Sequence, residues 1–147
     1  EVGLELLPPG TVLVAMYGGW QQIGRTAILE IQATTNQAIS ALVPDEKSIS
    51  PEYLLRALQH GRSRWKQVAA STRKDPNITK ADVNYFVLPL PSLLEQTQIS
   101  KMYRAILECL ACEEMQTEKL RLLKQGLMED LLTGCVRVTH LLNKAIR

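Results

Sequence analysis

The feature that most constrains this chain is one long helical stretch that runs from residue 92 to residue 132. Ser92 and Glu95 open it as a capping box, in which the serine hydroxyl accepts a hydrogen bond from the Glu95 amide. The stretch contains no proline, its interior glycine is Gly126, and Thr133-Gly134 ends it. At the rise of an α-helix, this stretch predicts a rod of about 60 Å.

Apolar side chains recur along this stretch at heptad spacing. Glu113 and Gln116 interrupt the apolar seam. Leu110 and Leu131 lie beside it, so the apolar face is wider than a two-position coiled-coil seam. A helix this long cannot bury such a face against a small domain, so we expect a partner helix from another part of a longer chain or from a second copy. The residues expected to pair with it are Ile99, Met102, Ile106, Leu110, Leu120, Leu123 and Leu127.

The residues before the long helix predict a small domain of strands and short helices. Ser50 caps a helix that begins with Pro51 and ends near Gly61, where left-handed backbone costs little. Thr79 caps a shorter helix that has Asp82 at its third position. Short apolar runs rich in β-branched residues predict strands over 11–16, 23–31, 38–43 and 85–88, and residues 135–138 are expected to begin another.

These elements predict an α+β fold class, with a small mixed or antiparallel β-rich domain followed by one long coiled-coil-forming α-helix. We expect the domain over residues 1–91, the helix over residues 92–134 and a tail or new segment over residues 135–147. The composition, 46% hydrophobic and 22% charged, is typical of a folded globular chain. No apolar run approaches the roughly 18 residues of a membrane span, so no membrane association is expected.

The three cysteines show no disulfide framework, which favours reduced thiols and a cytoplasmic protein. Cys109 and Cys112 form a C-x-x-C inside the helical stretch, without a second pair. We interpret them as two small, partly buried helix residues rather than as a redox or zinc site. His60 and His140 have no neighbour at ligand spacing, so no metal site is expected.

The net charge of +2 conceals an uneven distribution, because the stretch from His60 to Lys80 is strongly basic. Asp75 is its single acidic residue. Cations that neutralise DNA phosphates release counterions and give salt-dependent, sequence-independent affinity, whereas the simpler interpretation of each is a solvated surface charge. The phosphate-contact candidates are Arg62, Arg64, Lys66, Arg73, Lys74 and Lys80.

A glycine-rich loop follows the first expected strand and carries aromatic and polar side chains. Glutamine and arginine side chains can hydrogen-bond to base edges in the major groove of DNA. The alternative is a solvated hairpin loop with one packed tryptophan. The candidates for DNA contact are Tyr17, Trp20, Gln21, Gln22 and Arg25, and Arg25 is the strongest of them. Trp65 lies between two basic residues and is expected in the core rather than stacked on a base.

Several segments together resemble the DNA specificity subunits of type I restriction–modification systems. Residues 88–99 resemble the proline-rich turn and the EQ-x-x-I helix start of that family, and residues 119–134 resemble the end of its spacer helix. The segments 10–13, 23–25, 36–39 and 77–79 follow the family's order upstream. The resemblance covers about residues 9 to 138. Leu94 stands where the family often has a second proline.

The resemblance implies a partial target-recognition domain, because the family's domain begins well before the part that Gly10 matches. The chain is then a naturally reduced subunit or a piece of a longer one. Asn36 and Gln37 belong to a motif shared by subunits that read different sequences. We therefore favour a structural hydrogen-bonding role for them, and for the nearby Thr34, over base reading.

The resemblance further implies a non-catalytic specificity subunit that reads half of a split double-stranded DNA site, with its helix as spacer and assembly scaffold. The implied partners are DNA, the modification (methyltransferase) and restriction subunits, and a second copy or half-subunit paired through the helix. S-adenosylmethionine, ATP and Mg²⁺ are expected only on partner subunits, so no cofactor is expected here. The alternative is a truncated scaffold that dimerises or binds a methyltransferase subunit without binding DNA. The sequence contains no S-adenosylmethionine-binding loop motif, so we do not expect this chain to transfer methyl groups by itself.

Overall fold

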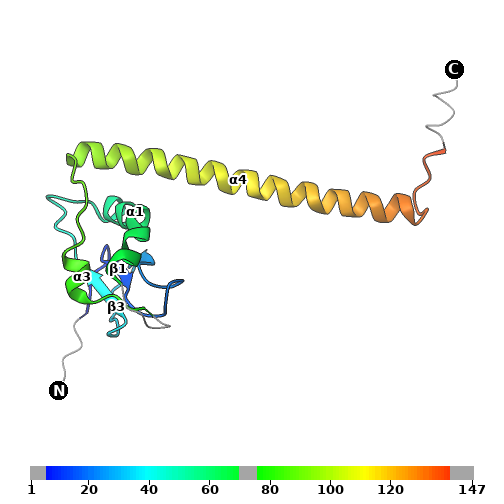
Figure 1. Ribbon diagram of the computed structural model, residues 1–147. Coiled ribbons are helices and arrows are strands. Elements are labelled where there is room, and N and C mark those ends of the chain that lie inside the picture. The colour runs from blue at the N-terminus through cyan, green and yellow to red at the C-terminus, as the bar shows by residue number, and fades with distance from the viewer. Residues whose placement is uncertain (1–5, 70–75, 140–147) are drawn as a thin grey trace. The chain divides into compact units, whose positions relative to one another are not determined.

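A computed structural model describes residues 6–69 and 76–139 of the chain (Figure 1). The chain divides into two compact units, residues 1–102 and residues 103–147. The first unit holds the sheet, the short helices and the start of the long helix, and the second holds the rest of the long helix. Two of the phosphate candidates, Arg73 and Lys74, lie outside the described residues, and the side chain of Lys66 is not described.

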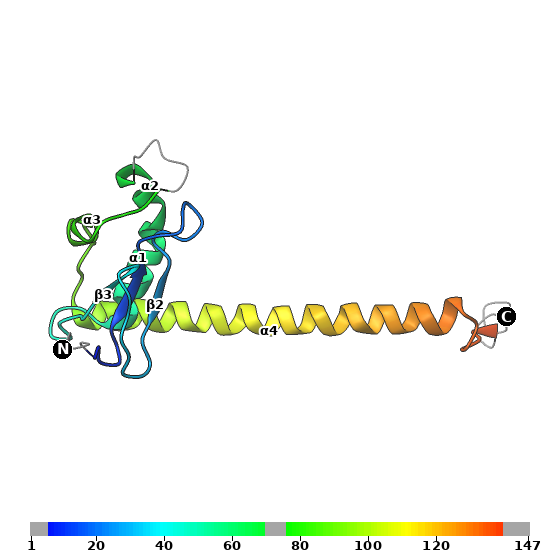
Figure 2. The same ribbon diagram turned by 90° about the horizontal axis from the view of Figure 1, so that it is seen from below.

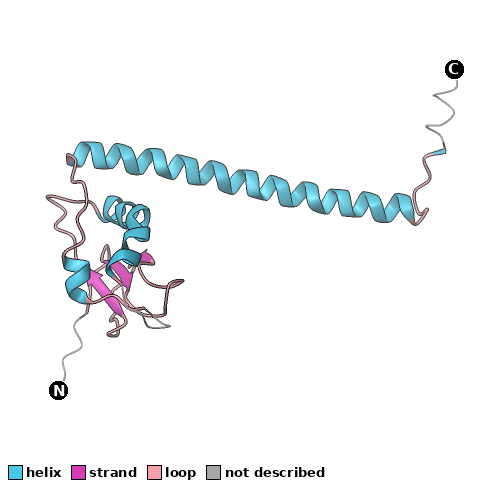
Figure 3. Cartoon of the chain, in the orientation of Figure 1, coloured by secondary structure: helices cyan, strands magenta, loops and turns pink. Residues whose placement is uncertain are grey.

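The first unit is built on a three-stranded antiparallel sheet, whose strands are magenta in Figure 3. In this sheet β1 lies between β2 and β3. The strands are β1 (Val12–Ala15), β2 (Thr26–Ile28) and β3 (Ile39–Leu42), each shorter than the sequence predicts. Val12 lies opposite Ile28 on one side and Leu42 on the other. Because side chains alternate along a strand, Val12 and Val14 point together into the core, where both are fully buried.

Helix α1 (Pro51–His60) packs against β1 and β2 and starts as the sequence predicts. The Ser50 hydroxyl accepts a hydrogen bond from the Tyr53 amide at 3.2 Å, and Pro51 occupies the first helical position. The apolar stripe of α1 places Leu54 and Leu58 in the same hydrophobic cluster as the buried valines of β1. The helix thereby covers one face of the sheet.

The prediction of a left-handed end at Gly61 is wrong, because its φ is −76°. The chain instead continues into the 3-10 helix η1 (Gly61–Arg64) and the short helix α2 (Trp65–Val68). Glycine is required there for space, since a Cβ at Gly61 would lie 2.7 Å from the Phe86 ring. Trp65 is fully buried and stacks on Phe86 with 4.1 Å between ring centroids, which confirms its place in the core.

Helix α3 (Lys80–Asn84) is short and begins with the predicted cap. The Thr79 hydroxyl accepts from the Asp82 amide at 3.2 Å, and the Thr79 amide donates to the Asp82 carboxylate at 2.7 Å. Both groups of the capping box are therefore satisfied.

The strand predicted over residues 85–88 is absent. Three backbone carbonyls in and after this segment accept hydrogen bonds from side chains instead of from a neighbouring strand. Val87 accepts from Arg64 at 2.7 Å, Pro89 from the Tyr53 hydroxyl at 2.9 Å and Pro91 from Gln96 at 2.9 Å. Pro89 and Pro91 also lack the amide hydrogens that a ladder needs.

Helix α4 (Leu93–Leu132) is continuous over 40 residues, as the sequence predicts (Figure 2). The Ser92 hydroxyl accepts from the Glu95 amide at 3.3 Å, which confirms the predicted cap. The strand expected over residues 135–138 is absent: Gly134 turns with φ of +77°, and the Val136 amide donates to the Asp130 carbonyl at 3.0 Å, so the chain wraps around the helix end. No helix among the described residues is long and apolar enough to cross a membrane.

Candidate nucleic-acid interface

The β1–β2 loop (residues 17–25) presents most of the predicted base-contacting side chains to solvent. Tyr17 and Trp20 are 45% and 43% exposed, so neither is the packed tryptophan or core aromatic of an ordinary hairpin loop. The loop turns on glycines with positive φ, and a side chain at Gly18 would be strained whatever the space. The exposed DNA candidates of the loop are Tyr17, Trp20, Gln21, Gln22 and Arg25.

Backbone contacts give this exposed loop a defined shape. The Gly24 amide donates to the Ala15 carbonyl at 2.8 Å, and the Ala15 amide donates to the Arg25 carbonyl at 2.8 Å. Gly24 lies flat against the indole of Trp65, where an added Cβ would be 2.1 Å from Cδ1. The base of the loop is therefore tied both to β1 and to the core.

Arg62 of η1 attaches the loop from a second side. Its Nε donates to the Ile23 carbonyl at 3.1 Å and its Nη2 to the Gln21 carbonyl at 2.6 Å. Two of the guanidinium donors are thus already used inside the protein. Whether Arg62 also contacts phosphate, as the sequence predicts, stays a prediction.

Arg25 is exposed, and its Nη1 donates to the Gln22 Oε1 at 3.0 Å. The Gln22 amide thereby orients the guanidinium and leaves further donors of Arg25 directed outward. A concave surface of about 370 Å³ begins at this point and is lined by Gly24, Arg25, Thr26, Gln59 and Arg62. The two loop residues best suited to hydrogen-bond to base edges are therefore adjacent and coupled.

The other described basic candidates lie in different surroundings. Arg64 is exposed, donates to the Val87 carbonyl at 2.7 Å and places its guanidinium carbon 4.4 Å from the centre of the Phe86 ring. Lys80 is exposed at the start of α3. The phosphate-contact role of both residues stays a prediction.

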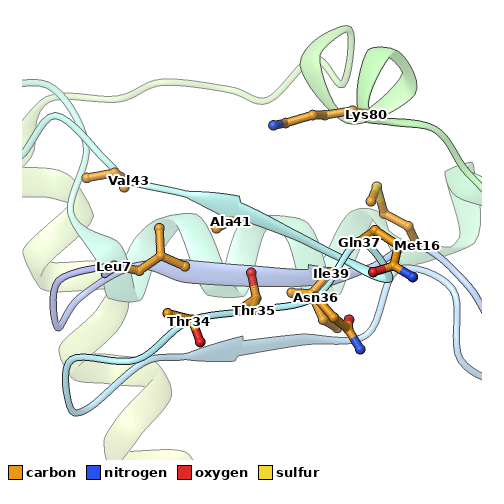
Figure 4. Close-up of a pocket in the computed structure, with 10 residues that line it drawn as sticks. All are labelled: Leu7, Met16, Thr34, Thr35, Asn36, Gln37, Ile39, Ala41, Val43 and Lys80. Atoms are coloured by element: carbon orange, nitrogen blue, oxygen red, sulfur yellow. The ribbon is translucent and has the colours of Figure 1, made fainter. Parts of the chain in front are cut away.

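A second concave surface, of about 500 Å³, lies over β3 (Figure 4). Most of its residues come from β3 and the segment before it, and the others are Leu7 before β1, Met16 just after β1, Val43 just after β3 and Lys80 of α3. The Asn36 Oδ1 accepts from the Ala38 amide at 3.0 Å, which confirms the structural hydrogen-bonding role predicted for Asn36. The lining residues are Leu7, Met16, Thr34, Thr35, Asn36, Gln37, Ile39, Ala41, Val43 and Lys80.

Sequence reasoning missed the role of Gln96, which is fully buried in the first turn of α4. Its Oε1 accepts from the Ser50 amide at 2.9 Å, and its Nε2 donates to the carbonyls of Ser48 and Pro91 at 3.0 and 2.9 Å. The EQ-x-x-I helix start already singled out Gln96, but the motif does not reveal its role, because two of its three partners lie 46 and 48 residues away. This residue joins the starts of α1 and α4.

Helix α4 carries the predicted pairing residues, all of them solvent-exposed in the single chain. Exposure ranges from 39% at Ile99 to 68% at Met102. Glu118 and Arg121 form an ion pair at 2.8 Å on its surface, and the hydrogen bond from Arg121 lowers the pKa of the Glu118 carboxyl. The prediction that Cys109 and Cys112 are partly buried is wrong for the single chain, because both are exposed on α4. Within the described ranges, no group of three or more His, Cys, Asp or Glu side chains could hold a metal ion.

Comparisons with known proteins agree on one family. Residues 2–122 match the family model described as Type I restriction modification DNA specificity domain. A putative type I restriction enzyme MjaX specificity subunit of Methanocaldococcus jannaschii is 28% identical over 129 residues, and the match covers 84% of this chain and 30% of that protein. The chain therefore spans about a third of the length of this relative.

Two solved structures share the fold. A chain from a structure of complex assembly and conformational transition in the type I R-M system superposes with a TM-score of 0.66 and 24% identity, over 86% of this chain and 31% of its own length. The HsdS subunit from Thermoanaerobacter tengcongensis gives a TM-score of 0.65 and 22% identity, over 85% and 30% respectively. The predicted combination of a small antiparallel sheet and a long C-terminal helix is thereby confirmed.

Proposed function

This chain belongs to the family of type I restriction–modification DNA specificity domains, and we propose that it reads one half of a split double-stranded DNA target within such a system. The family is a specificity domain and not a methyltransferase or nuclease domain, so the chain is non-catalytic. The observation that carries the proposal is the β1–β2 loop, which exposes Arg25, Gln22 and Trp20 while its base is anchored to the core. Arginine and glutamine are side chains that discriminate bases in the major groove.

The basic stretch around η1 and α3 supplies the sequence-independent part of the proposed binding. Lys80 and Arg64 are exposed and belong to the same unit as the loop. Contacts of this kind fix the register of a protein on the duplex, whereas base contacts specify the sequence. The two sets of residues together would give an affinity that is both salt-dependent and sequence-dependent.

The long helix is the proposed spacer and assembly element. At about 1.5 Å per residue, α4 extends for roughly 60 Å, or nearly two of the ~34 Å repeats of the DNA major groove, which is the right order of length to hold two half-sites apart. Ile106 and Leu120 of α4 are 57% and 64% exposed in the single chain. A partner helix, from a second copy or from another part of a longer subunit, would bury this face and set the distance between two half-sites.

The modification and restriction subunits of a type I system are the further proposed partners, in the cytoplasm where the target DNA lies. S-adenosylmethionine, ATP and Mg²⁺ are proposed to bind those partners rather than this chain. The competing function is a scaffold that pairs through the helix without contacting DNA, and the exposed face of α4 is equally compatible with it.

Fluorescence anisotropy with pools of labelled duplex DNA tests the proposed reading function. We expect the logarithm of the association constant to fall linearly with the logarithm of the salt concentration, with a slope near −0.9 for each phosphate neutralised. Substituting Arg64→Ala should weaken binding to all sequences alike. Absence of binding at every salt concentration would reject DNA reading and leave the scaffold function, and a changed base preference in Arg64→Ala would contradict its phosphate role.

The pairing role of α4 is tested by solution mass. Ile106→Glu and Leu120→Glu each place a charge on the apolar face, and we expect either to shift the paired species towards single chains, with at least a tenfold weaker association. Met115→Glu is the matched control, because Met115 is also exposed on α4 but lies off the pairing face. An unchanged mass in both pairing-face variants, or an equal effect of the control, would contradict the proposed face.

A further inference from the structure

The contacts of Arg62 differ from those expected of a surface cation. Its Nε and Nη2 donate to the carbonyls of Ile23 and Gln21, which lie 39 and 41 residues away in the sequence. Both carbonyls belong to the β1–β2 loop, and the residue itself is only partly exposed. Hydrogen bonds from a charged donor are about twice as strong as neutral ones, so they suit an arginine that fixes backbone.

A second contact from the same segment supports the same loop. Trp65 begins α2 immediately after η1, and its indole lies against Gly24, where even a Cβ would be 2.1 Å away. Arg62 and Trp65 are three residues apart in a helical segment, so they project from nearly the same side. The loop is therefore fixed at two points by one short segment, through a hydrogen-bonded fork and an aromatic surface.

The fixed backbone determines where the exposed side chains point. Gln22 lies between the two carbonyls that Arg62 binds, and the Gln22 amide oxygen orients the Arg25 guanidinium. A loop fixed before binding loses less conformational entropy when it docks, and it presents one geometry to the bases rather than many. Loss of the two hydrogen bonds from Arg62 would allow Gln22 and Arg25 to adopt several orientations.

We propose that Arg62 is a positioning residue, which holds the β1–β2 loop in its DNA-reading shape, and that it contributes through Arg25 and Gln22 rather than through a phosphate. This inference rests on the proposed function in DNA reading. Arg62 would then contribute to sequence specificity, whereas Lys80 would contribute to sequence-independent affinity for DNA.

The test compares variants of the protein assembled with a modification subunit, on a duplex target obtained by selection from random DNA with the wild-type complex. Two quantities are measured for each variant: the ratio of affinities for the selected and a scrambled duplex, and the slope of log affinity against log salt. We expect Arg62→Ala to lower the ratio about tenfold and to leave the slope unchanged. Lys80→Ala should do the opposite, with a slope smaller by about 0.9 and an unchanged ratio.

Arg62→Lys separates charge from geometry, because lysine keeps the charge but cannot form the two-point fork. We expect it to lose discrimination as Arg62→Ala does. A wild-type ratio in Arg62→Lys, or a slope reduced by about 0.9 in Arg62→Ala, would overturn the positioning role and assign Arg62 to a phosphate.

Hydrogen exchange on the chain without DNA provides a measurement that does not depend on the proposed function. We expect Arg62→Ala to raise amide exchange in residues 21–25 at least tenfold relative to the β1 amides. Unchanged exchange in those residues would overturn the inference while leaving DNA reading intact. Failure of the wild-type complex to select any DNA would instead reject the proposed function.

Discussion

The two units of the chain differ in how far their apolar side chains are buried. In the first unit, Val12, Trp65 and Ile78 are fully buried. In the second, Leu120 and Leu132 of α4 are 64% and 78% exposed, and every described residue from 101 onwards is exposed. Burial of apolar surface is the main favourable contribution to folding. The first unit therefore carries the source of its stability within itself, whereas the second requires a surface from elsewhere.

Local interactions within α4 do not replace that missing burial. The Glu118–Arg121 pair is exposed, and pairs of this kind contribute little to stability in water. In folded proteins, most of the stability of a helix comes from tertiary packing of its apolar face, and α4 lacks such packing in the single chain. The contrast between the two units thus predicts which substitutions matter in the single chain and which matter only in the paired state.

The largest expected difference is between two apolar truncations. Trp65→Ala removes a fully buried ring and should lower the free energy of unfolding by about 3–5 kcal/mol. Leu123→Ala removes an exposed side chain and should change the unfolding of dilute single chains by less than about 0.5 kcal/mol. Urea unfolding followed by circular dichroism measures both. Comparable losses in the two variants would remove the distinction between the units.

A smaller effect is expected at the start of α4. Gln96→Leu leaves the Ser50 amide and two carbonyls without their partners, which should cost about 2–3 kcal/mol. Gln98→Leu is the matched control, because Gln98 is exposed two residues further along the same helix. The same unfolding experiment compares them. A loss at Gln98 as large as at Gln96 would mean that helix propensity, and not the buried amide, determines the result.

The smallest effect is expected at Gly126, and it has the opposite sign. A Cβ at this position meets no atom within 4 Å, so Gly126→Ala should stabilise the helix of the single chain by about 1 kcal/mol. Thermal unfolding of the helical signal measures the gain. In the paired state the same substitution sharpens the comparison, since weakened pairing would show that the partner backbone passes close to residue 126.

The parts of the fold that sequence predicts correctly are those with local causes. Ser50, Thr79 and Ser92 each accept a hydrogen bond from an amide three residues later, and all three caps are where the sequence places them. The strand predicted over residues 85–88 is wrong, because the conformation of this segment depends on side chains that are distant in sequence. The β propensity of this apolar run does not show that Arg64 donates a hydrogen bond to the Val87 carbonyl, or that the Tyr53 hydroxyl donates one to the Pro89 carbonyl.

The candidate site divides in the same way. The glycines of the β1–β2 loop predict an exposed turn, and Trp20, Gln21 and Gln22 between them are indeed at the surface, whereas Ile23 is buried in the core. The fork from Arg62 to this loop could not be predicted, because it joins residues about 40 positions apart through backbone carbonyls that carry no sequence signal. The basic stretch therefore appeared uniform in sequence, although its members have different surroundings in the fold.

The buried amide of Gln96 has a consequence for how the chain may be shortened. A fragment that ended at Pro91 would lack Gln96. The Ser50 amide and the Ser48 carbonyl, at the beginning of α1, would then lose their buried hydrogen-bond partner. A shortened chain that keeps these contacts retains the first turns of α4, through Ser100, which is also buried. A domain exchange in this chain would therefore keep the polar contacts of α1 only if its boundary falls beyond those turns.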